Sequence, residues 1–137
     1  MPNDRTHSSK RVLIADDDPI IRRLLSSAVT SEGYTAVVVE DGRAAFRMLQ
    51  ADAGFTAALF DMRMPGLNGI DLIRHMRTEK RLQRIPVMLI TAEQDLRVMS
   101  DSFAAGAVAF LSKPLTVDKL QTGLRMLLHS AQTHIAA

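Results

Sequence analysis

Two residue types are absent from the chain and a third is rare: its 137 residues include no cysteine, no tryptophan and only one tyrosine. The absence of cysteine excludes disulfide bonds and metal sites built on thiolates, and it agrees with a reducing compartment. No apolar run approaches the roughly 20 residues of a membrane-spanning helix. Residues 1–10 also lack the apolar centre of a secretory signal. We therefore expect a cytoplasmic protein that does not insert into a membrane.

Charge of either sign is not in large excess. Seventeen Lys and Arg stand against fifteen Asp and Glu, which gives a formal net charge of +2. Without a dense basic run or a basic surface rich in aromatic residues, we expect no direct contact with nucleic acid. Apolar residues form 47% of the chain, enough for one folded domain. We place that domain at residues 11–129, between a flexible N-terminal arm (1–10) and a short C-terminal tail (130–137).

Short apolar segments alternate with amphipathic, helix-like segments along this domain. The apolar segments predict strands at 11–15, 35–39, 57–60, 87–90 and 108–111. Apolar residues at helical spacing predict helices that begin near residues 19, 42, 70, 95 and 116. This alternation favours an α/β fold in which helices cover both faces of a five-stranded parallel sheet and the crossovers are right-handed.

Five polar residues lie just after four of these apolar segments. Asp16 and Asp17 follow the first segment, Asp61 the third, Thr91 the fourth and Lys113 the fifth. The carboxyl ends of parallel strands lie at one edge of an open sheet, where ligands and catalytic groups collect. The sequence therefore predicts that these side chains share one site.

The chemistry of these residue types suits a metal ion and a phosphoryl group. Converging carboxylates repel one another, and Mg²⁺ is a common compensating ion because it prefers hard oxygen ligands. A carboxylate such as Asp61 can attack phosphorus, and a hydroxyl and an ammonium can bind phosphoryl oxygens. Helix capping accounts for Asp18, which precedes Pro19. For the acidic triplet 16–18 alone, capping and metal binding both remain open.

Four short motifs carry a resemblance to a known family. The motifs are Asp16-Asp17, Asp61-Met62-Arg63-Met64-Pro65-Gly66, Thr91-Ala92 and Lys113-Pro114. On these residues, over about 11–129, the chain resembles the receiver domain of two-component response regulators, including the single-domain chemotaxis regulators. The resemblance implies a doubly wound, flavodoxin-like sheet with strand order 2-1-3-4-5 and five helices.

The resemblance also implies a role for each acidic residue. Asp61 would accept a phosphoryl group from a histidine kinase or a histidine phosphotransfer protein. Asp17 would bind Mg²⁺ (or Mn²⁺) directly, and Asp16 would bind it through water. Asp61 and the backbone carbonyl of Arg63 would complete the protein ligands of the metal.

Further residues would hold and report the phosphoryl group, again as the resemblance implies. Thr91 and Lys113 would bind its oxygens, and Thr91 and Phe110 would form a switch that changes the protein surface. The chain would be a signalling domain rather than an enzyme, with only self-catalysed phosphotransfer and dephosphorylation. Its expected partners are the phosphodonor, an unidentified downstream protein and a second copy bound through segments 95–105 and 108–111 and the last helix.

Several alternatives to this interpretation remain. The chain could be a receiver-like interaction module that is never phosphorylated, or a receiver that belongs to a longer regulator. It could also be a phosphatase with an aspartate nucleophile, although Arg63 stands where that class has an acid–base aspartate. Arg63 and Glu93 could pair near the phosphoryl group or remain two solvated charges.

Overall fold

The structure is a computed structural model that describes residues 10–92 and 96–136. Five strands and five helices alternate within these residues. The strands are β1 (Arg11–Ala15), β2 (Thr35–Val39), β3 (Ala57–Asp61), β4 (Val87–Thr91) and β5 (Ala109–Ser112). The helices are α2 (Pro19–Ser31), α3 (Gly42–Ala51), α4 (Gly69–Arg77), α5 (Leu96–Ala105) and α6 (Val117–Ala136).

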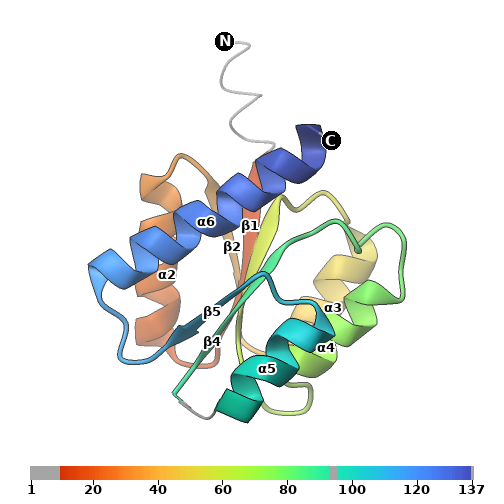
Figure 1. Cartoon of the computed structure of the whole chain (residues 1–137), viewed down its shortest axis with the longest axis horizontal. Helices are drawn as coiled ribbons and strands as arrows, with labels where there is room; N and C mark the ends of the chain where they lie inside the picture. The colour runs from red at the N-terminus through yellow and green to blue at the C-terminus, as the bar shows by residue number, and fades with distance from the viewer. Residues whose placement is uncertain (1–9, 93–95, 137) are drawn as a thin grey trace.

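The strands form one parallel sheet in the order β2-β1-β3-β4-β5. Helices α2 and α6 cover one face of the sheet, and α3, α4 and α5 cover the other (Figure 1). The predicted α/β fold, the five-stranded sheet and the strand order are therefore confirmed. Because β1 and β3 are neighbours, the chain changes winding direction between them, and their carboxyl ends flank the crevice where such sheets bind ligands.

Each face of the sheet has its own hydrophobic core, because successive side chains of a strand point to opposite faces. In β1, Leu13 and Ala15 belong to the core beneath α3 and α4. Val12 and Ile14 belong to the core beneath α2 and α6. Strands β3 and β4 are buried along their whole length, as is typical of central parallel strands. The carboxyl ends of the central strands are thus anchored from both faces.

Polar side chains cap the helices that follow the carboxyl edge of the sheet. The Asp18 carboxylate accepts a hydrogen bond from the backbone N–H of Ile20 (2.9 Å), which confirms the predicted cap of α2. The Asn68 side chain accepts one from the backbone N–H of Asp71 (2.9 Å) at the start of α4. Each cap satisfies a backbone donor that the helix leaves unpaired. The caps therefore help to fix the loops that leave β1 and β3.

The last helix extends beyond its expected end. Helix α6 continues to Ala136, where the sequence led us to expect a tail from residue 130. Leu127 and Ala131 are buried, so the apolar stripe of the helix continues into that segment. Most of the expected N-terminal arm, residues 1–9, lies outside the described residues. In the part of the chain that is described, we find no helix of the length and apolarity needed to traverse a bilayer.

Candidate functional site

Three carboxylates from two neighbouring strands meet at the carboxyl edge of the sheet. Asp16 and Asp17 follow β1 and Asp61 ends β3, and one carboxylate oxygen of each lies within 4.8 Å of the others. The register that pairs Ala15 with Phe60 places the two strand ends side by side. Asp16 is fully buried and Asp61 is 6% exposed, whereas Asp17 is exposed. The structure therefore brings together the acidic residues that the sequence placed at one edge.

The segment after β5 brings a cation to this cluster. The Lys113 ammonium lies 3.5 Å from an oxygen of Asp61 and 3.9 Å from one of Asp16. The backbone N–H of Lys113 donates a hydrogen bond to the Thr91 carbonyl (2.7 Å), which ties the end of β5 to the end of β4. Thr91 is 1% exposed, and the peptide bond between Lys113 and Pro114 is cis. The five predicted site residues thus share one edge of the sheet.

The two oxygens of the Asp16 carboxylate differ in their surroundings. Oδ1 accepts a hydrogen bond from the backbone N–H of Asp18 at 2.9 Å. Oδ2 is buried and has no hydrogen-bond partner, although the Lys113 ammonium lies 3.9 Å away. A buried acceptor left without a hydrogen bond is unusual and costly. Because this unpartnered oxygen lies beside two other carboxylates, it is suited to bind a metal ion.

Sequence reasoning missed one residue that supports the site. Arg22, in the first turns of α2, donates a hydrogen bond from Nη1 to the backbone carbonyl of Asp16 (2.8 Å). This contact holds the segment that carries Asp16 and Asp17. The only sequence signal is the position of Arg22 three residues after Pro19, and arginine is so common in helices that this spacing is not specific.

Burial and mutual repulsion disfavour negative charge in the cluster. Burial, followed by the neighbouring Asp16 carboxylate, raises the pKa of Asp61 to about 6, although Lys113 opposes this shift. Burial also raises the pKa of Asp16, against the hydrogen bond from Asp18 and the charge of Lys113. A divalent cation would relieve both effects. The three carboxylates, with the orphaned oxygen of Asp16, could therefore hold a metal ion such as Mg²⁺.

A hollow of about 510 Å³ lies beside the carboxylates and gives access to them. It is lined by Asp17, Met62, Arg63, Met64, Pro65 and Asn68. The segment that forms it turns back against the strand end, because a β-carbon on Gly69 would lie 2.8 Å from the carbonyl oxygen of Asp61. Arg63 is exposed. Glu93 lies outside the described residues, so its pairing with Arg63 stays a prediction.

The expected switch residue, Phe110, lies apart from the carboxylates. It is half-buried on β5, and its ring centroid is 6.5 Å from that of Phe103 on α5. Two residues further along β5, Ser112 is the register partner of Thr91. The structure therefore links Phe110 to the site through two adjacent strands rather than through direct contact with the carboxylates.

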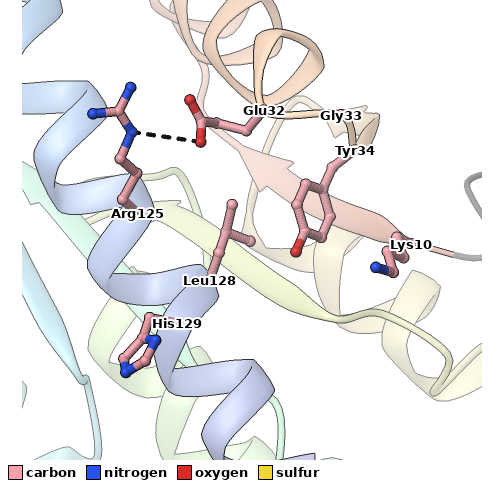
Figure 2. Close-up of a pocket in the computed structure, with 7 residues that line it drawn as sticks. All are labelled: Lys10, Glu32, Gly33, Tyr34, Arg125, Leu128 and His129. Carbon is pink, nitrogen blue, oxygen red and sulfur yellow. Dashed lines mark ion pairs between the residues drawn. The ribbon is translucent and has the colours of Figure 1, made fainter.

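A second hollow, of about 310 Å³, lies at the amino edge of the sheet (Figure 2). It is lined by Lys10, Glu32, Gly33, Tyr34, Arg125, Leu128 and His129. The Arg125 guanidinium lies 3.6 Å from the Glu32 carboxylate across it, and the side chain of Arg125 is 63% exposed. The charged groups of this amino-edge hollow remain hydrated. The hollow therefore lacks the buried, mutually repelling carboxylates that distinguish the carboxyl edge.

Comparisons with known proteins identify the family to which the chain belongs. The family model of the response regulator receiver domain matches residues 12–125. The chain is 33% identical over 112 residues to the chemotaxis protein CheY of Pseudomonas aeruginosa. That alignment covers 81% of this chain and 90% of the relative.

Two solved structures have a similar fold. The chemotaxis response regulator CheY4 of Vibrio cholerae has a TM-score of 0.80 at 27% identity, over 87% of this chain and 98% of that one. The receiver domain of the sensor histidine kinase PA1611 from Pseudomonas aeruginosa PAO1 has a TM-score of 0.77 at 27% identity, over 90% and 98% of the two chains. That structure has a magnesium ion coordinated in the active-site cleft. With its fold and with a family match over most of its length, this chain belongs to the response regulator receiver domain family.

Proposed function

We propose that the protein is the phosphoacceptor of a two-component signalling system and receives a phosphoryl group on Asp61 from a histidine kinase or a histidine phosphotransfer protein. One observation carries the proposal: Asp61 is 6% exposed, yet it lies among two further carboxylates and 3.5 Å from the Lys113 ammonium. Family membership supports the same role. The buried, charged surroundings suit a group that reacts with a charged donor.

In the proposed transfer, a carboxylate oxygen of Asp61 attacks the phosphorus of a phosphohistidine. The oxygen–phosphorus bond forms as the phosphorus–nitrogen bond breaks, and the electron pair of the broken bond leaves with the imidazole nitrogen. Asp61 must be ionised to attack, and a pKa of about 6 leaves it mostly ionised at pH 7. Lys113 is close enough to bind an oxygen of the transferred group and offset its charge.

The three carboxylates would also bind the metal that this chemistry needs. Asp17 and Asp61 would hold Mg²⁺ (or Mn²⁺) directly and Asp16 would hold it through water, with the backbone carbonyl of Arg63 as a further ligand. The bound metal supplies positive charge against the phosphoryl oxygens and the carboxylates. The buried Oδ2 of Asp16 fits this role because it has no hydrogen-bond partner. Arg22 would keep Asp16 in position through its hydrogen bond to the backbone.

Thr91 and Phe110 would convert phosphorylation into a change of surface. A phosphoryl group adds a charge of about −1.5 to −2, and the Thr91 hydroxyl would move toward it. That movement would leave room for Phe110, now half-buried, to pack further inward. The surface of α5, β5 and α6 would change, and with it the binding of a downstream protein or a second copy. The chemotaxis role named for a relative supports output through protein contacts.

Intact-mass spectrometry after treatment with acetyl phosphate tests the phosphoacceptor. We expect wild type to gain one phosphoryl group in Mg²⁺ and none in EDTA, and Asp61→Asn to gain none in either. Asp101→Asn, which removes an exposed carboxylate of α5, is the matched control and should behave as wild type. No gain on wild type, or an equal gain on Asp61→Asn, would refute the proposal.

A second experiment separates a switch from a constitutive interaction module. Binding partners are captured in a pull-down in which the wild-type protein is the bait, with and without acetyl phosphate. The same pull-down is carried out with Asp61→Asn as the bait under both conditions. We expect at least one partner whose binding depends on phosphorylation of wild type and is absent or unregulated with Asp61→Asn. An identical partner set in all four samples would favour the module that is never phosphorylated.

A further inference from the structure

Positive charge is concentrated in one part of a chain whose overall charge is nearly balanced. Residues 42–84 carry eight Lys and Arg against four Asp and Glu, whereas the rest of the chain carries nine against eleven. The segment contains α3, β3 and α4, and its two helices lie next to each other on one face of the sheet (Figure 1). The basic excess of the whole protein therefore comes from this segment, in which Arg43, Arg47, Arg74 and Arg77 belong to the two helices.

Contacts between α3 and α4 bring the exposed basic residues of the two helices close together. Arg43 and Arg47 lie four residues apart on the exposed side of α3. Arg74 and His75 are exposed on α4, and the His75 ring lies 5.2 Å from that of Phe46 on α3. After α4, Arg81 donates hydrogen bonds of 3.4 and 3.3 Å to backbone carbonyls at the end of α3. We call the surface formed by Arg43, Arg47, Arg74, His75 and Arg81 the basic face.

Local carboxylates neutralise the basic face only in part. Asp71 lies 3.6 Å from Arg74, and Glu79 lies 3.3 Å from Arg81, but these ion pairs are largely open to solvent. Within the described part of the chain, neither Arg43 nor Arg47 forms an ion pair. Exposed guanidinium groups without carboxylate partners attract an acidic ligand and accelerate its encounter.

A partly apolar hollow lies within the same surface. It has a volume of about 360 Å³ and is lined by Leu67, Asp71, Arg74, His75 and Thr78. Leu67 offers an apolar wall there, and the half-buried ring of Phe46 packs against His75 nearby. A hollow of this kind can take one apolar side chain, while the surrounding arginines bind acidic neighbours of that side chain.

We propose that the basic face is a docking surface for an acidic protein segment that inserts an apolar side chain beside Leu67 and His75. A protein segment fits better than nucleic acid, because Asp71 and Glu79 are interspersed among the arginines and would repel a continuous row of phosphates. This interaction is separate from phosphorylation and requires no change at Asp61.

Fluorescence anisotropy with a labelled synthetic peptide of repeated Glu-Glu-Leu tests the surface. At low salt, the double variant Arg43→Glu/Arg47→Glu should weaken binding by at least about tenfold. Lys10→Glu/Arg23→Glu makes the same change of charge at exposed residues elsewhere and should weaken it by about twofold or less. Equal losses in both variants would show attraction to net charge alone and would overturn the proposal. Circular dichroism checks folding, and Arg43→Gln/Arg47→Gln, a milder change, should still weaken binding more than the control.

Further probes test the class of partner and the apolar anchor. A peptide with serine in place of leucine should bind several-fold more weakly, and oligo-dT of equal net charge should bind more weakly than the Glu-Glu-Leu peptide. Equal affinity of the two peptides, or tighter binding of oligo-dT, would overturn the proposal. Amide chemical-shift changes should cluster in α3 and α4. Asp61→Asn should bind the peptide as wild type does, so failure of the phosphoacceptor function and failure of this surface are distinguishable.

Discussion

The two edges of the sheet show how differently similar charges behave when they are buried and when they are exposed. At the carboxyl edge, the Lys113 ammonium lies 3.5 Å from Asp61, and these side chains are 24% and 8% exposed. At the amino edge, the Arg125 guanidinium lies 3.6 Å from Glu32, and these side chains are 63% and 21% exposed. Because the separations are nearly equal, the loss of hydration, rather than distance, distinguishes the two edges.

Loss of hydration changes what a charge contributes. An exposed ion pair such as Arg125–Glu32 contributes about 0–1 kcal/mol, because water and salt screen it. In the buried cluster the carboxylates lose water and repel one another, so the pKa values of Asp16 and Asp61 rise even beside a lysine. Because Lys113 balances the negative charge of the carboxylates only in part, the site can bind a further cation. The energetic effects of substitution should therefore concentrate at the carboxyl edge.

The largest difference between the edges is expected in the pH dependence of stability in EDTA. The pKa of Asp61 rises from 3.8 to about 6 on folding, so between these values the folded protein binds more protons than the unfolded chain. The free energy of unfolding should therefore fall as the pH rises from about 4 to about 6. A shift of about two units corresponds to a loss on the order of 3 kcal/mol. Urea unfolding at a series of pH values measures it.

Two variants assign this pH dependence to the carboxyl edge. Asp61→Asn should remove most of the fall, whereas Glu32→Gln at the amino edge should leave it unchanged. The relevant quantity is the difference between wild type and each variant, because contributions from other titrating groups cancel in it. If the difference between wild type and Asp61→Asn stayed constant from pH 4 to pH 6, the pKa of Asp61 would not be raised in the folded protein.

Removal of the cation at the carboxyl edge should have the next largest effect. Lys113→Met leaves Asp16 and Asp61 without the charge that lies 3.9 and 3.5 Å from them. At pH 7 in EDTA, the free energy of unfolding should fall by about 1–2 kcal/mol, because one member of a largely buried ion pair is lost. Urea unfolding measures the change. An unaltered unfolding midpoint would mean that hydration of the carboxylates, and not Lys113, stabilises them.

Much of the fold could be predicted because its signals are local. The apolar segments of β1 and β2 predicted those strands with the bounds that the structure has, and the helical spacing predicted that α3 begins at residue 42. The site residues could be anticipated for the same reason, since each follows an apolar segment and parallel strands align their carboxyl ends. The strand order, by contrast, came from resemblance to a family, because local patterns do not specify which strands are neighbours.

Some features were not predicted from the sequence because they depend on contacts between distant residues. One further feature was missed because the net charge of the whole chain does not show how charge is distributed along it. The hydrogen bond from Arg22 to Asp16 exists only once α2 has packed beside β1. The continuation of α6 depends on burial of Ala131 against the rest of the protein. The basic face was hidden by the overall charge of +2, in which the acidic residues of other segments offset its arginines. Tertiary structure was needed to show that these arginines share a surface.

The smallest effect is expected from Arg125→Met at the amino edge. The ion pair that it removes is long and exposed, so the free energy of unfolding should change by less than about 0.5 kcal/mol at pH 7. A double-mutant cycle with Glu32→Gln should give a coupling energy of similar size, which urea unfolding can measure. If Arg125→Met destabilised the protein as much as Lys113→Met, exposure would not separate the two edges. Ion-pair distance, which is nearly the same at both, would then be the better guide to what a charge contributes in this fold.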